Sequence, residues 1–176
     1  MNTAIRPPKF NYCPLCGTRL GSKRDEEGIV RANCPADNWT YYPHPHIASC
    51  ALILNKDDQV LLVKRAREPK KGLWSFPAGF IDFGELPRTA LIREVSEETG
   101  LKVIWAKLKW IQIVKDDPRS AGILSFIFQT RVSDGKLLNG DRHENSELGW
   151  FNLSGLPPIA WEGHQRVLQS ISKRVR

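Results

Sequence analysis

Three segments that follow residue 45 have the apolar pattern of β-strands. Segments 46–54 and 59–65 are β-prone runs joined by the turn-forming residues 55–58, and segment 124–132 alternates strictly between apolar and polar positions. Strict alternation is typical of a strand that buries one face, and short apolar runs bounded by turn residues are typical of buried strands. We therefore predict a strand at each of the three segments.

Two further strands are predicted from weaker patterns. Segment 103–114 alternates loosely, with Leu108 and Trp110 on one side, and segment 147–153 is a shorter β-prone run. Residues 79–84, which precede the first helical pattern, are expected to form a loop.

Two segments have the pattern of helices. Residues 86–99 form the clearer helix, because Pro87 suits a first turn and Gly100 suits a left-handed C-terminal cap. A second helix begins near Glu162, and its apolar residues line one face. These residues are Val167, Leu168, Ile171 and Val175. The order of strands, helix, strands and helix predicts an α/β fold with a mixed sheet covered by helices.

The first 45 residues differ in composition and in hydrophobic pattern from the rest of the chain. They are rich in Cys, Pro, Gly and Asn and show no period long enough to build a core. We expect a small irregular module at residues 1–45 and the main domain at residues 46–176. A chain of 176 residues with 41% hydrophobic residues suits one ordinary domain with such an appendage, and excludes a disordered chain.

The charge and the hydropathy of the chain limit the class of partner that it can bind. The 26 Lys and Arg residues against 19 Asp and Glu residues give a formal net charge of +7, which favours an anionic partner such as a nucleotide, a phosphate ester or nucleic acid. No apolar run approaches the roughly 18 to 20 residues that span a bilayer. Residues 1–12 lack the apolar core of a secretory signal. We expect a cytoplasmic protein with no membrane partner.

The first predicted helix carries a cluster of carboxylates. At 100° per residue, Glu94, Glu97 and Glu98 share one face. The like-charged pair Glu94 and Glu98 destabilises an isolated helix by roughly 0.2 to 0.5 kcal/mol, and both lie where the helix dipole disfavours acids. Either a divalent cation such as Mg²⁺ or Mn²⁺ offsets this cost, or the face is solvated and contacts Arg93 and Arg88.

The residues around this helix decide between those readings. From Gly79 to Leu101 the chain follows the pattern G-x5-E-x7-R-E-U-x-E-E-x-G-U, where U is a bulky apolar residue, with every fixed position matched. The segment resembles the signature of the Nudix hydrolase family. Residues 72–80 and 149–151 extend the resemblance, which covers roughly residues 46–176.

The resemblance implies a fold, a reaction and a set of site residues. The fold is an α/β/α sandwich with a mixed sheet, and the reaction is hydrolysis of a nucleoside diphosphate linked to another moiety. The implied metal ligands are the carbonyl of Gly79 and the carboxylates of Glu94, Glu97 and Glu98, and Arg93 is implied to pair with Glu85. The general base stays open: we favour Glu94 or Glu97 on the helix over two acids before the last strand. These two acids are Glu144 and Glu147.

The cysteines predict a second metal site. Cys13-x-x-Cys16 has the spacing of a zinc knuckle, and Cys34 is followed at the same spacing by Asp37. The segment resembles the zinc ribbon that precedes the catalytic domain in a Nudix branch that includes NADH pyrophosphatases. Asp37 departs from the fourth cysteine of that ribbon. Either Asp37 ligates a structural zinc ion, or one of two histidines replaces it, or the ribbon is metal-free. The two histidines are His44 and His46.

The remaining candidate residues carry weaker signals. Cys50 is expected to be a small buried residue, and His143 and His164 are expected to be surface or structural histidines. One of the tryptophans is a candidate for stacking on a nucleobase. The three candidates are Trp39, Trp110 and Trp161.

The predicted partner is a small-molecule nucleotide. The ribbon favours a substrate with a bulky group on either side of the diphosphate, so ADP-ribose, NADH and FAD rank ahead of nucleoside triphosphates. The alternative is a nucleic-acid-binding or nucleotide-sensing regulator built on a Nudix fold, which the complete carboxylate set disfavours. A homodimer is left open.

Overall fold

The computed structural model describes residues 9–118, 120, 122–133 and 135–173. The chain divides between Pro45 and His46 into two compact units. Val175, which the pattern places on the second helix, lies outside the described residues. No helix among the described residues is long and apolar enough to cross a membrane.

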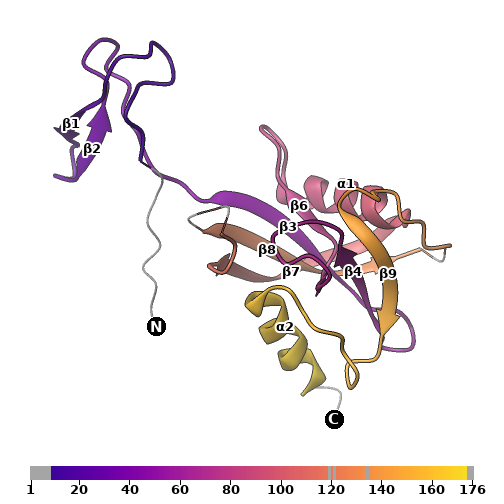
Figure 1. The fold of residues 1–176 in the computed structure, drawn as a ribbon. Coiled ribbons are helices and arrows are strands. Elements are labelled where there is room, and N and C mark those ends of the chain that lie inside the picture. Colours follow the sequence, from indigo (N-terminus) through magenta and orange to yellow (C-terminus); the bar gives the residue numbers. More distant parts are fainter. Residues whose placement is uncertain (1–8, 119, 121, 134, 174–176) are drawn as a thin grey trace. The chain divides into compact units, whose positions relative to one another are not determined.

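The unit before His46 contains a short hairpin (Figure 1). Strands β1 (Gly21–Arg24) and β2 (Val30–Asn33) pair antiparallel. The expectation of an irregular module is therefore wrong for these two segments. Both strands are four residues long and no residue of either is fully buried. The one alternating stretch, the four residues of β2, is at the shortest length that indicates a strand.

The unit from His46 onward holds seven strands and two helices among the described residues. The strands are β3 (His46–Ile53), β4 (Val60–Arg65), β5 (Trp74–Ser75), β6 (Ala78–Phe80), β7 (Val103–Val114), β8 (Ile123–Val132) and β9 (Asn145–Phe151), and the helices are α1 (Pro87–Thr99) and α2 (Glu162–Ser172). One sheet has the order β6-β3-β8-β7 and the other has the order β5-β4-β9. The first sheet is mixed, because β3 and β8 run parallel while its other pairs are antiparallel.

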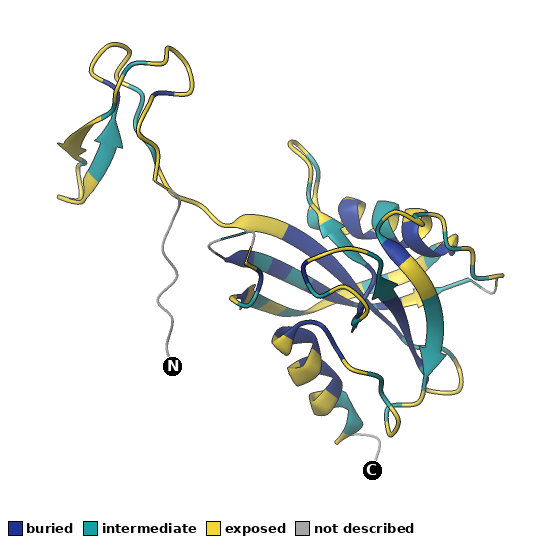
Figure 2. Ribbon diagram, viewed as in Figure 1, coloured by how far each residue is buried: buried dark blue, intermediate teal, exposed yellow. Residues whose placement is uncertain are grey.

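The two helices cover opposite faces of the sheets. Cys50 and Leu52 of β3 belong to the apolar cluster that includes residues of α2, whereas Ala51 and Ile53 belong to the cluster that includes residues of α1. A strand that is buried on both faces reads as a continuous apolar run, which explains the pattern of β3. Figure 2 shows the buried residues along the strands and on the inner sides of the helices. The predicted α/β/α sandwich with a mixed sheet is confirmed.

The signals at both ends of α1 are confirmed, and one expected loop is partly wrong. Pro87 is the first residue of α1, and Gly100 caps the helix with φ of 70° while its amide donates to the carbonyl of Ser96. The segment 79–84 was expected to be a loop, but Gly79 and Phe80 belong to β6, which pairs with β3. A three-residue strand with a central glycine has no period that a sequence pattern can detect.

Candidate functional site

A cavity of about 340 Å³ brings together residues of both helices and of several strands. Four of the site residues that the motif implies line it: Gly79, Arg93, Glu94 and Glu98. Such a volume is within the usual range of small-molecule sites.

Gly79 lies in close contact with the end of the Glu94 side chain. A Cβ atom at this position would overlap the carboxylate of Glu94. Strand β6 therefore lies directly against this side of α1, and any larger residue would displace the Glu94 side chain. The glycine of the sequence motif thus fixes how closely the helix carboxylate approaches the backbone.

Arg93 ties the loop before α1 to the helix. Its Nε and Nη2 donate to both oxygens of Glu85, at 3.1 and 2.8 Å, and Nη2 also donates to the carbonyl of Phe80 at 3.0 Å. Its Nη1 donates to Glu94 Oε1 at 2.6 Å and to Glu97 Oε2 at 3.3 Å. Hydrogen bonds from the guanidinium lower the pKa of Glu85, and those to the carboxylates raise the pKa of Arg93. The bidentate pair holds the loop and helix in one register.

Glu98 is a carboxylate buried inside the unit. Its side chain accepts hydrogen bonds from the Ala78 amide at 2.9 Å and from Asn145 Nδ2 at 2.7 Å. Burial raises the pKa of Glu98 to about 8, and burial also raises the pKa of Glu94. Two desolvated carboxylates on one cavity repel each other, and a divalent cation would relieve that cost. The donor set, made of hard carboxylate oxygens, fits Mg²⁺ or Mn²⁺.

The other predicted acids are placed differently. Glu97 is exposed on α1 and does not line the cavity. Of the two acids before the last strand, Glu144 lines the cavity and forms an ion pair with Arg67. Glu147 is exposed, lies outside the cavity lining and pairs with Lys64 at 3.1 Å. Of these two acids, Glu144 is therefore the one placed to contact a molecule in the cavity.

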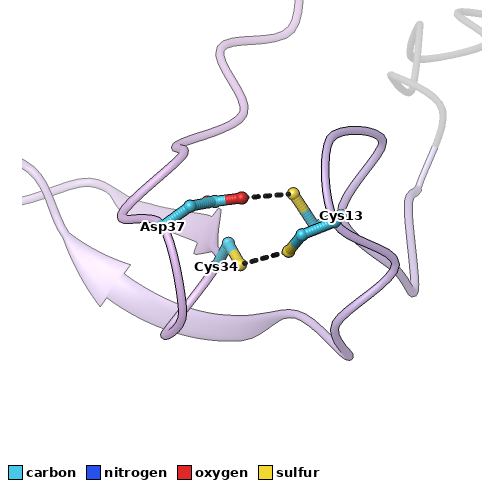
Figure 3. A group of neighbouring side chains, drawn as sticks. Cys13, Cys34 and Asp37 are labelled. Atoms are coloured by element: carbon cyan, nitrogen blue, oxygen red, sulfur yellow. Dashed lines mark hydrogen bonds between the residues drawn. The ribbon is translucent and has the colours of Figure 1, made fainter.

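The predicted zinc ligands converge in the unit before His46 (Figure 3). One ligand atom from each of Cys13, Cys16, Cys34 and Asp37 lies within 4.8 Å of the others. Cys13 Sγ donates to Asp37 Oδ2 at 3.3 Å, and the Cys16 and Cys34 sulfurs are 3.5 Å apart. Four ligands around a tetrahedral zinc ion are separated by about 3.5 to 3.8 Å. The set therefore needs only a small contraction to hold zinc.

Two similar turns present these ligands. In the first turn the Gly17 amide donates to the Cys13 carbonyl at 2.9 Å, and in the second the Asn38 amide donates to the Cys34 carbonyl at 3.0 Å. Gly17 and Asn38 both have positive φ, 73° and 60°. Asp37 consequently occupies in the second turn the place that Cys16 occupies in the first.

The electrostatics of the cluster suit a cation. Hydrogen bonds from the Trp39 amide and from the thiols lower the pKa of Asp37 to about 2, so its carboxylate is ionised. Burial raises the pKa of Cys34 to about 11 in the absence of a metal. Within this unit, His44 is not a member of the cluster, and its Nδ1 lies 3.4 Å from the Pro45 carbonyl. His46 belongs to the unit that follows, where its ring packs against the Phe80 ring.

Comparison with known proteins identifies the family. The NUDIX domain family matches residues 44–171. The chain belongs to this family.

Curated relatives agree with that assignment. An ADP-ribose pyrophosphatase of Methanocaldococcus jannaschii is 36% identical over 85% of this chain and 86% of its own length. The NAD-capped RNA hydrolase NudC of Vibrio parahaemolyticus is 29% identical over 88% of this chain, and the chain spans 55% of that protein. The prediction of a Nudix-type hydrolase is confirmed at the level of the enzyme family.

A solved structure shows the same fold. The crystal structure of a NUDIX hydrolase from Nitrosomonas europaea has a TM-score of 0.75 and 24% sequence identity to this chain. The likeness covers 94% of this chain and 92% of that one.

The weaker candidate residues of the Nudix unit are now placed. Cys50 is buried as expected, 3.2 Å from Ser125 Oγ, and it also lines the cavity. His143 is exposed. His164 is a buried histidine whose Nδ1 accepts the Phe76 amide.

Of the two candidate tryptophans in the Nudix unit, Trp161 lines the cavity and Trp110 does not. Trp110 packs against the apolar core, and Trp39 stacks on Tyr41 in the unit before His46.

Sequence reasoning missed several cavity residues. Asn145 holds Glu98, and Arg65, Arg67 and Ser75 line the cavity wall. Each is a single polar residue at a strand end or beside one, and no second site residue lies at a characteristic distance from it along the sequence. No signal in one sequence distinguishes such a residue from an ordinary surface group.

Proposed function

We propose that this Nudix protein is a metal-dependent pyrophosphohydrolase. Its substrate is a nucleoside diphosphate linked to a second moiety, of the ADP-ribose, NADH or FAD class. The observation that carries the proposal is the pair of desolvated carboxylates, Glu94 and Glu98, held beside Gly79 on a cavity large enough for a small molecule. The names of the curated relatives support the substrate class.

The proposed metal ligands are those implied by the motif. Glu94, Glu97 and Glu98, with the Gly79 carbonyl, would hold Mg²⁺ or Mn²⁺. Glu97 lies outside the cavity lining with its Oε2 3.3 Å from Arg93 Nη1, so its side chain would have to turn toward the cavity to bind the ion. A bound divalent cation supplies charge neutralisation on the diphosphate oxygens and activates water.

Two kinds of side chain would act beside the metal: an arginine that positions the loop, and a carboxylate that accepts a proton. Arg93, through its bonds to Glu85 and Phe80, fixes the loop that carries one wall of the cavity. We assign Glu94 or Glu97 as the base that accepts the proton of the attacking water. Glu144 is the alternative base, because it lines the same cavity beside its Arg67 partner.

We further propose that residues 1–45 form a zinc ribbon and residues 46–176 the catalytic domain. One structural zinc ion would be held by Cys13, Cys16, Cys34 and Asp37. The convergence of their ligand atoms and the ionised Asp37 carboxylate support this.

A substrate panel tests the proposed function. With Mg²⁺ or Mn²⁺, AMP should be released from ADP-ribose, NADH or FAD faster than pyrophosphate is released from any nucleoside triphosphate. Preferential pyrophosphate release would contradict the substrate class. No hydrolysis of any member, together with salt-dependent RNA binding, would favour the regulator instead.

A further inference from the structure

A histidine in the first turn of α2 is held in one tautomer. His164 is 2% exposed, and its ring stacks on the Phe76 ring with centroids 4.3 Å apart. Its Nδ1 accepts the backbone N–H of Phe76 at 3.3 Å. Because Nδ1 is the acceptor, the proton of the neutral ring is on Nε2. The imidazole is therefore a fixed N–H donor.

His164 also lines the cavity that contains Glu94 and Glu98. Burial, with a smaller effect from the Arg65 charge, lowers the pKa of His164 to about 3. The Arg65 side chain makes two further contacts. Its Nε donates to the Pro69 carbonyl, and its guanidinium lies 5.3 Å from the centre of the Trp161 ring. At neutral pH the donor at this wall of the cavity is uncharged.

Several residues that line the cavity with His164 are small or apolar, and Arg65 lines it as well. Ala48, Trp161 and Ile123 belong to one buried cluster, and all three line the cavity. Ala48 and Ser125 are paired neighbours on β3 and β8, and Ser125 lines the cavity too. Small side chains on a sheet beside an indole leave room for a planar ring.

We propose that His164 recognises the nucleobase of the substrate, its Nε2–H donating to a ring nitrogen or carbonyl oxygen of the base. The inference rests on the proposed function, which places the diphosphate at Glu94 and Glu98. It makes His164 a specificity-determining residue for that reaction. An uncharged donor in a cavity that also presents Ala48, Ile123 and Trp161 suits an uncharged aromatic ring better than it suits a phosphate.

Two substitutions separate recognition from structure. In His164→Asn the amide oxygen replaces Nδ1 as the acceptor for Phe76, and the Nε2 donor is lost. In His164→Gln the amide nitrogen replaces the Nε2 donor, and the acceptor for Phe76 is lost. If His164 recognises the base, His164→Asn should lower AMP affinity more than His164→Gln does. If its role is purely structural, His164→Gln should lower AMP affinity more.

Binding of AMP and of ribose 5-phosphate, measured by calorimetry with Mg²⁺ on the full chain, provides the readout. For His164→Asn we expect AMP affinity to fall about tenfold and ribose 5-phosphate affinity to change less than twofold. His164→Gln should retain more AMP affinity than His164→Asn. In turnover assays on the preferred panel substrate, His164→Asn should raise KM and leave kcat nearly unchanged.

Three outcomes would overturn the proposal. Equal losses for AMP and ribose 5-phosphate would show that the contact is not to the base. A larger loss for Gln than for Asn would show a structural role. Wild-type protein that hydrolyses the panel but gains no affinity from the base would reject base recognition while the proposed function stands. Failure of hydrolysis with His164-dependent AMP binding would reject the function alone.

Discussion

The two units of this Nudix protein hold their polar clusters by opposite means. Before His46, the buried residues among those described are Cys13 and Cys34, both members of the ligand cluster, so the cluster is the core. After Pro45, three apolar clusters form the core, and the carboxylates of α1 lie on a cavity at its side.

In the first unit the ligand cluster would stabilise the fold, whereas in the second unit the fold holds the carboxylates in place. A unit of about 40 residues buries too little apolar surface to be stable by that means alone, so the proposed zinc ion would supply the missing stability. The larger unit folds on its own core and keeps Glu98 desolvated, at a cost in stability that serves function. Removing a ligand should therefore unfold the first unit, whereas removing Glu98 should leave the second unit folded.

The largest expected effect is in the first unit. Cys34→Ser should abolish zinc binding and make residues 9–45 sensitive to protease, because structural zinc contributes about 10 to 16 kcal/mol of apparent binding energy in small domains. The fragment from His46 onward should stay resistant. Zinc content by elemental analysis and limited proteolysis with mass spectrometry are the measurements.

Cys50→Ser is the matched control, because Cys50 is a buried thiol of the second unit outside the cluster. It should retain one zinc ion per chain. Wild-type protein purified without chelator that contains no zinc would reject the site. Normal zinc content in Cys34→Ser would remove Cys34 from the ligand set.

The next effect is on turnover. Glu98→Gln keeps the size of the side chain and removes its charge, so the fold should survive while kcat falls by about 10² to 10³. The Asn145 amide can reverse its orientation to pair with the new amide. Metal-dependent hydrolysis at saturating Mg²⁺ and circular dichroism are the measurements.

Glu97→Gln tests whether the exposed helix acid belongs to the same metal site, and it should also lose turnover. Glu162→Gln, an exposed acid at the start of α2, is the control and should stay within about twofold of wild type. Wild-type turnover in Glu98→Gln would exclude the proposed metal site.

The same contrast explains what the sequence could predict. The strands and helices of the second unit have periodic apolar residues because they build a core, and the motif from Gly79 to Leu101 identifies the family. Strands β1 and β2 bury little, and their only alternating stretch is the four residues of β2. Cavity residues such as Asn145 and Arg65 are brought to the site by tertiary packing, which residue spacing does not encode.

The smallest expected effect is the pH dependence that His164 gives to the stability of the second unit. The pKa of His164 is about 3 in the folded state, below the 6.5 of an unfolded histidine. Between these values the unfolded state binds a proton that the folded state does not, so the free energy of unfolding falls as pH drops below 6.5. One such site changes it by at most about 1.4 kcal/mol per pH unit. His164→Asn should be less stable than wild type at pH 7.5, and the difference should shrink by about 2 kcal/mol at pH 5. Urea unfolding at both pH values measures it, and a difference that stays constant with pH would show that His164 is not held neutral.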